Sequence, residues 1–173
     1  MDAAGTLSER KRSMYRDALA FGMNTAKQRL PLGLQFRSGI RPQPLACRSV
    51  LLVEDRDEVY RYLANEWVSV GLHVSLATYA ADAMDQLVHC RADLLVANYA
   101  LPDSSGWLLT AKARLVSPTP RIWLYAPWPT PHEMAMAQFV GADGLIAHRG
   151  DICRLSAVIL SRITVLPLLR KRA

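Results

Sequence analysis

Two carboxylates and one amide follow apolar runs, in positions that would let them share a site. Glu54 and Asp55 come directly after Val50–Val53, and Asn98 comes directly after Leu94–Ala97. If these runs are neighbouring parallel strands, the three side chains meet at the carboxyl ends of the strands, where open α/β sheets bind ligands. Carboxylate and amide oxygens are ligands for Mg²⁺, so the chemistry to consider is cation binding or the pairing of buried acids.

The sequence from Ser49 onward alternates short apolar runs with helical periodicity. This pattern is typical of βα units around a parallel sheet whose strands are buried on both faces. We therefore predict an α/β domain with a flavodoxin-like (βα)5 doubly wound parallel sheet of strand order 2-1-3-4-5. The predicted strands are Val50–Val53, His73–Leu76, Leu94–Ala97, Ile122–Ala126 and Gly144–Ala147.

Helix start signals lie between these strands. The clearest is Thr130 followed by Pro131 and Glu133, which predicts a capping box with proline at the first helical position. Similar signals predict Asp57 as the N-cap of Glu58–Val70, Thr78 before Ala80–Cys90, Ser104 or Ser105 before Gly106–Val116, and Asp151 before Ile152–Ile163.

Three separated motifs carry a resemblance to a known family: VLLVED at the first strand, LPDSSGW after the third, and GADGLIAHRGD around the fifth. Residues 49–165 resemble the receiver domain of two-component response regulators, the CheY-like superfamily. In that family the acidic pair and an Asp ending the third strand bind Mg²⁺, and this Asp accepts phosphate from a histidine kinase. The resemblance implies a role in phosphorelay signal transduction.

The chain departs from the family at the positions that carry this chemistry. Asn98 falls at the phospho-acceptor position, and an amide is not a competent nucleophile for forming an acyl phosphate. The phosphate-binding lysine of the family falls on His148, its strand-four Ser/Thr on Tyr125, and its strand-five switch aromatic on Leu145. We therefore expect a degenerate pseudo-receiver that needs no cofactor, has no small-molecule substrate and is not an enzyme.

Such a module would act by protein–protein contact. The expected contact is with a partner or a second copy, through the face formed by the fourth helix, fifth strand and fifth helix. Trp128 lies between Pro127 and Pro129, where an aromatic side chain is either held at the surface for a partner or half-buried against its own loop. Trp67, Trp107 and Trp123 lie in helix or strand patterns and are predicted to be core or half-buried residues.

Several alternatives remain open at the acidic pocket. Glu54 and Asp55 would either retain residual Mg²⁺ binding or be neutralised by His148, whose charged form two nearby carboxylates would favour. A regulator that is still phosphorylated would need an unusual acceptor, and Asp55 and Asp103 are the candidates.

The net charge of +6 is confined to an N-terminal extension. Residues 1–48 hold nine Lys/Arg and three Asp/Glu, whereas residues 49–173 hold twelve of each. We predict an amphipathic helix over residues 6–30, an irregular linker over 31–48 and a basic tail over 166–173. This charge suggests another function as an alternative to a signalling module that acts by protein contact: residues 1–48 would bind nucleic acid or an anionic membrane surface.

Cysteine spacing and hydropathy indicate where the chain resides. The three cysteines form no CxxC pair, so neither a zinc ribbon nor a disulfide framework is predicted. The most apolar stretch, Ser156–Leu169, is interrupted by Arg162 and Pro167 and is shorter than the roughly 20 residues of a membrane helix. We expect a cytoplasmic location.

Overall fold

A five-stranded parallel sheet forms the centre of the molecule. The computed structural model describes residues 45–165, and within them the strand order of this sheet is β3-β2-β4-β5-β6. These strands are the predicted ones in the predicted order 2-1-3-4-5, so the flavodoxin-like fold is confirmed. Their bounds are β2 Ser49–Val53, β3 His73–Ala77, β4 Leu94–Asn98, β5 Arg121–Ala126 and β6 Gly144–Ala147.

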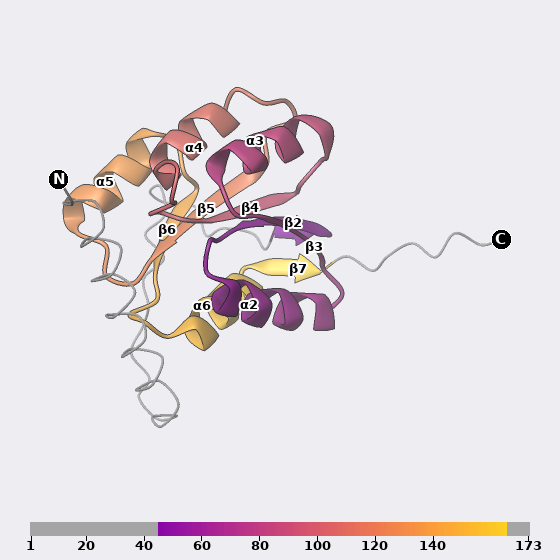
Figure 1. Ribbon diagram of the computed structural model, residues 1–173. Helices are drawn as coiled ribbons and strands as arrows, with labels where there is room; N and C mark the ends of the chain where they lie inside the picture. Colours follow the sequence, from indigo (N-terminus) through magenta and orange to yellow (C-terminus); the bar gives the residue numbers. More distant parts are fainter. Residues whose placement is uncertain (1–44, 166–173) are drawn as a thin grey trace.

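Helices cover both faces of the sheet (Figure 1). On one face lie α2 (Asp57–Ser69) and α6 (Ile152–Leu160), and on the other lie α3 (Ala80–His89), α4 (Gly106–Ala113) and α5 (Pro131–Phe139). Alternate strand residues enter opposite cores, as the two-residue period of a strand requires: Leu52 packs with Trp67, and Leu51 packs beneath α3 and α4. The tryptophan predictions hold, since Trp67 and Trp123 are buried and Trp107 is half-buried.

The prediction that every strand is fully buried is wrong for β3. All five residues of β4 are buried, but only Ala77 is buried in β3, because β3 is an edge strand with one neighbour. The His73 amide and the Ala77 carbonyl form hydrogen bonds on the β2 side. Because successive residues of a strand direct their backbone groups to opposite sides, the Leu76 carbonyl points to the outer edge of the sheet. There the Gln86 side-chain amide donates to it at 2.6 Å.

The predicted helix starts are confirmed where the N-cap side chain itself accepts a hydrogen bond from the first turn. The capping box of Thr130 and Glu133, the Ser105 cap and the Asp151 cap are all present. The predictions of Asp57 and Thr78 as N-caps are wrong: Arg56 and Tyr79 occupy those positions, and neither caps through its side chain. The first amides of α3, those of Ala80 and Ala81, donate instead to the Asp103 carboxylate at 2.9 and 3.2 Å.

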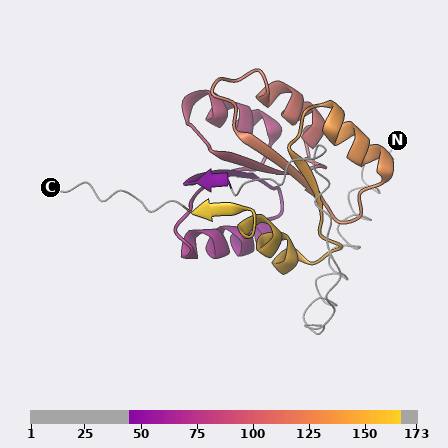
Figure 2. The ribbon, with the colours of Figure 1, turned by 180° about the vertical axis from the view of Figure 1, so that it is seen from behind.

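Two short strands were not predicted. β1 (Leu45–Cys47) pairs in parallel with β7 (Ile163–Val165), and Figure 2 shows the two side by side. The irregular linker predicted over 31–48 is therefore wrong at residues 45–47, and the last helix ends at Leu160 rather than Ile163. The predicted helix over 6–30 and the tail over 166–173 lie outside the described residues. In the described part of the chain, no helix is both long and apolar enough to cross a membrane.

Gly106 sets how closely α4 approaches the end of β4. A Cβ atom at this position would lie 2.9 Å from the Asn98 carbonyl oxygen and 2.9 Å from the Tyr99 Cα. Both are backbone atoms that no rotamer change can move aside. The Gly106 amide also donates to the Tyr99 carbonyl at 2.8 Å, so the helix start fixes the backbone that carries Asn98.

Gly106→Ala is expected to destabilise the fold by about 1–3 kcal/mol, the range typical of overpacking, despite the better helix propensity of alanine. Urea unfolding measures the change. Lys112→Ala, at an exposed position on the same helix, is the control and should change the free energy of unfolding by less than about 0.5 kcal/mol. Equal stability of Gly106→Ala and the native protein would contradict the close approach.

Candidate functional site

The carboxyl ends of the strands bring together most of the residues that the sequence singled out. Glu54 follows β2, Asn98 ends β4, Tyr125 lies near the end of β5 and His148 follows β6. All four side chains are buried, whereas Asp55 is exposed. We call these residues, together with Arg56, the carboxyl-edge site. Leu145 does not join them, because its side chain belongs to the opposite core, beneath α5.

The Glu54 carboxylate is the most heavily bonded group of the site. Oε1 accepts from the Arg56 backbone amide at 3.0 Å and from Arg56 Nε at 2.8 Å. Oε2 accepts from Arg56 Nη2 at 2.6 Å and from the Tyr125 hydroxyl at 2.5 Å. A carboxylate offers about four acceptor positions, so both oxygens of Glu54 are fully used.

These bonds keep Glu54 ionised in a buried position. Burial raises the pKa of the Glu54 carboxyl, but the hydrogen bonds and charge of Arg56, with the Tyr125 hydroxyl, outweigh it and the net shift is downward. The same ion pair is bidentate, the geometry in which a guanidinium binds a carboxylate most strongly. The Glu54 negative charge is therefore permanent at neutral pH and is matched inside the protein.

His148 is neutral, contrary to the sequence-based expectation. Burial, helped by the positive charge of Arg56, lowers its pKa to about 4, and the attraction of Glu54 and Asp151 offsets only part of this shift. Its ring instead packs edge-on against Tyr125, with the ring centroids 5.9 Å apart. The interpretation of His148 as the group that neutralises the acidic pair is therefore wrong, because Arg56 has that role.

Asp55 and Asn98 complete the site. Partial burial and the adjacent Glu54 carboxylate raise the pKa of Asp55. The Asn98 side-chain oxygen accepts from the Ala100 amide at 3.2 Å, so the amide closes the turn after β4. Asn98 is the last residue of β4, and Asp55 follows β2 by two residues.

The site as folded does not fit a divalent cation. Every acceptor position of Glu54 is used, which leaves the exposed Asp55 as the only carboxylate of the pair with room for an ion. Mg²⁺ requires near-octahedral oxygen coordination and usually one or two carboxylates. Within residues 45–165 no cluster of three or more His, Cys, Asp or Glu side chains is arranged to hold a metal ion.

Asp103 and Trp128 lie outside this network. The Asp103 carboxylate caps α3; burial raises its pKa, but the backbone hydrogen bonds together outweigh that effect and the net shift is downward. Trp128 is 52% exposed, so its indole is available at the surface of the loop between β5 and α5.

Arg56 is the functional residue that sequence reasoning missed. A signal was present, since it directly follows Glu54 and Asp55 in the loop after the first strand. The family pattern places the partner of the acids at His148, after another strand, whereas the partner of Glu54 is a residue two positions away that folds back on it.

Comparison with known proteins gives the fold. The chain matches no protein-family model and no curated protein. It is similar to the chemotaxis response regulator CheY4 of Vibrio cholerae (TM-score 0.61, 19% identity, 68% of this chain and 100% of that one). It is also similar to a CheY-like receiver domain protein of Methanospirillum hungatei JF-1 (0.60, 19%, 67% and 93%) and a two-component response regulator of Clostridium difficile (0.59, 22%, 66% and 97%). These likenesses show that the described domain has the receiver-domain fold.

The neutrality of His148 predicts a pH dependence of stability. Its ordinary pKa is 6.5 and its folded pKa is about 4, so between these values the unfolded chain binds the extra proton. Stability should fall as pH drops from 6.5 to 4, by on the order of 3 kcal/mol from this group at the acid end. Urea unfolding at several pH values should show a flatter decline for His148→Gln.

His132→Gln, at an exposed position, is the matched control and should retain the native decline. A native slope in His148→Gln would contradict a low pKa for His148.

Proposed function

We propose that this domain is a receiver-like signalling module that works by protein contact and without aspartyl phosphorylation. The observation that carries the proposal is Asn98, which stands at the carboxyl end of the central strand, the position of the acceptor aspartate in the family that the sequence resembles. Its amide lacks the nucleophilic oxygen that an acyl phosphate requires.

The neighbours of Asn98 support the same conclusion. A neutral, buried His148 provides no cation at the position where the family has a lysine that pairs with the phosphoryl group. Tyr125 cannot serve as a mobile switch hydroxyl while it donates to the buried Glu54 carboxylate. Asn98 and Tyr125 are thus engaged in hydrogen bonds of their own, and His148 contributes a neutral ring packed against Tyr125.

Asp55 and Asp103, the two alternative phospho-acceptors, are poorly suited to phosphotransfer. Asp103 already uses both carboxylate oxygens to cap α3, and a phosphoryl group there would remove that cap. Asp55 is exposed, but its neighbouring cation Arg56 is bound to Glu54. Lys112 is the cation whose charge acts on Asp103, and the cation beside Asp55 is held by another carboxylate, whereas a transferring phosphoryl group needs cations aimed at its oxygens.

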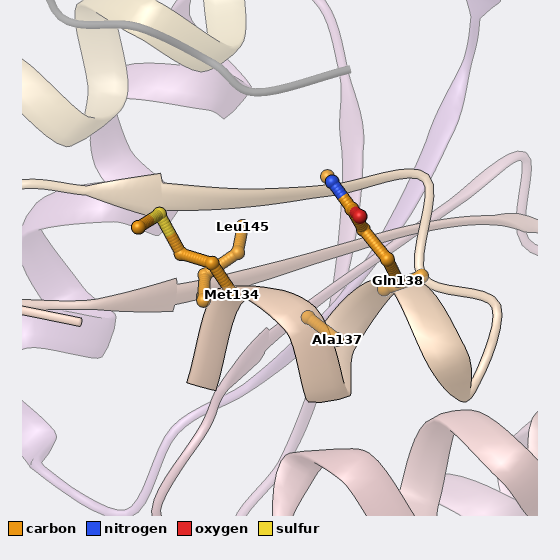
Figure 3. Close-up of a pocket in the computed structure, with 6 residues that line it drawn as sticks. Met134, Ala137, Gln138 and Leu145 are labelled. Atoms are coloured by element: carbon orange, nitrogen blue, oxygen red, sulfur yellow. The ribbon is translucent and has the colours of Figure 1, made fainter. Parts of the chain in front are cut away.

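The face of α5, β6 and α6 is the proposed contact surface. β6 is the last strand of the main sheet, so within the described residues one of its edges has no strand partner. Between α5 and β6 lies a small groove, and Figure 3 shows Met134 and Gln138 of the helix and Leu145 of the strand among the residues that line it. Its lining carries no formal charge: Met134, Ala137, Gln138, Ala142, Gly144 and Leu145.

A second copy of the chain is the partner that fits this surface best. A two-fold dimer buries the same patch on both subunits, so a charged patch would face its own charge. The neutral groove avoids this repulsion. At the end of α5, Phe139 is 85% exposed and adds apolar area that association would remove from water.

Phosphorylation is tested by intact-mass analysis after incubation with acetyl phosphate and Mg²⁺. The native protein should gain no phosphoryl mass, because Asn98 cannot form the acyl phosphate. A control receiver domain with an intact acceptor should be labelled in the same mixture. A labile phosphoryl group on the native chain, mapped to a peptide containing Asp55 or Asp103, would overturn the proposal.

Contact through the groove is tested by size-exclusion chromatography with light scattering. The native chain should run as a dimer, and Gln138→Arg, which places a charge in the groove of each subunit, should shift the mass toward the monomer. Val88→Arg, at an exposed position on α3, is the matched control and should leave the dimer intact. A native protein that is monomeric at high micromolar concentration would contradict the dimer.

A further inference from the structure

Arg56 places a positive charge against both carboxylate oxygens of Glu54, as a bound metal ion would. Its guanidinium contacts both oxygens, at 2.8 Å through Nε and 2.6 Å through Nη2, and neutralises one buried negative charge. The Glu54 side chain has no exposed surface, and that of Arg56 is 22% exposed. The cation therefore lies on the solvent side of the carboxylate and covers it.

We propose that Arg56 is a built-in cation, which occupies the carboxyl-edge site in place of a divalent metal ion and holds Tyr125 in its buried position. The inference rests on the proposed function in one respect, the assignment of this edge as a remodelled receiver site. It adds a residue that neither the family pattern nor the fold assigns.

The local backbone explains why Arg56 is always in place. Arg56 is the N-cap residue of α2, with extended φ and ψ of −94° and 111°, and its backbone amide donates to Glu54 Oε1. The side chain therefore starts beside the carboxylate it binds. A guanidinium also keeps its charge at every pH at which the protein folds, so the built-in cation does not dissociate by losing a proton.

Tyr125 is held through the same carboxylate. Its hydroxyl donates to Glu54 Oε2, the oxygen that Arg56 Nη2 also contacts, and its ring packs against His148. If Arg56 lost its charge, Glu54 would be an unpaired buried anion that either takes up a proton or recruits another cation. Arg56 is in this sense a positioning residue for Tyr125.

Removal of Arg56 should open the site to a metal ion. The Glu54 carboxylate would then have acceptor positions to spare, with the Asp55 carboxylate next to it in the chain and the Asn98 oxygen at the end of the adjacent strand β4. Two carboxylates and one amide oxygen are a ligand set that suits Mg²⁺ completed by water. In the native chain, Arg56 fills these acceptor positions of Glu54.

The test measures Mg²⁺ binding by the full-length chain and by Arg56→Met, which keeps an unbranched apolar stem and removes the charged guanidinium. Isothermal titration with MgCl₂ gives the affinity, and the thermal midpoint is compared with that in NaCl of equal ionic strength. Arg56→Met should bind Mg²⁺ at least ten-fold more tightly than the native protein, and its midpoint should rise with Mg²⁺ beyond the salt effect.

Arg61→Met is the matched control, because Arg61 is exposed on the same helix and its ion pair with Asp57 lies at the surface. It should behave as the native protein does. Equal Mg²⁺ affinity in Arg56→Met and the native chain, whether both bind or neither does, would overturn the proposal.

Arg56→Lys provides a second comparison if Arg56→Met folds poorly. A lysine keeps the charge, so it should hold the Mg²⁺ affinity close to the native value. An affinity raised ten-fold or more in Arg56→Lys would overturn the proposal, because a positive charge at this position would then fail to exclude the metal ion. These readouts involve no phosphoryl transfer, so their failure would leave the acetyl phosphate result, and with it the proposed function, to stand or fall separately.

Discussion

The ion pair between Glu54 and Arg56 is the interaction on which the carboxyl edge of the sheet depends. A carboxylate with no exposed surface is costly unless it is paired and fully hydrogen-bonded, and here four donors meet that requirement. The other features of the edge follow from it. Tyr125 is turned inward as one of the four donors, and the positive charge of Arg56 is one reason why His148 stays neutral.

The fold supplies the rest of the arrangement. A parallel sheet covered on both faces by helices brings all its carboxyl ends to one rim, so residues far apart in sequence become neighbours there. The loops on this rim are fixed by two devices: the missing side chain at Gly106, which lets α4 approach the end of β4, and the Asp103 carboxylate, which caps α3. Asp103, one of the two alternative acceptors, is thus part of the scaffold.

What the sequence predicted correctly is what local patterns encode. Apolar runs located the five central strands, and the spacing of Thr130 and Glu133 located the start of α5. The failures have a common physical origin, since they depend on contacts between distant residues or on side-chain direction. The cap of α3 comes from Asp103, β1 pairs with the far end of the domain, and Arg56 folds back on Glu54 rather than pointing to solvent.

The side-chain amide of Gln86 makes the two edge strands of the sheet, β3 and β6, unequal as sites for strand addition. An edge strand with unpaired carbonyls is a template on which another chain can add a strand, and this is a route to aggregation. On β3 the outward carbonyl of Leu76 is already occupied by Gln86, so an incoming strand would have to displace that bond. This bond disfavours the addition of a strand at β3. At the opposite edge, β6, contact between molecules therefore requires less rearrangement.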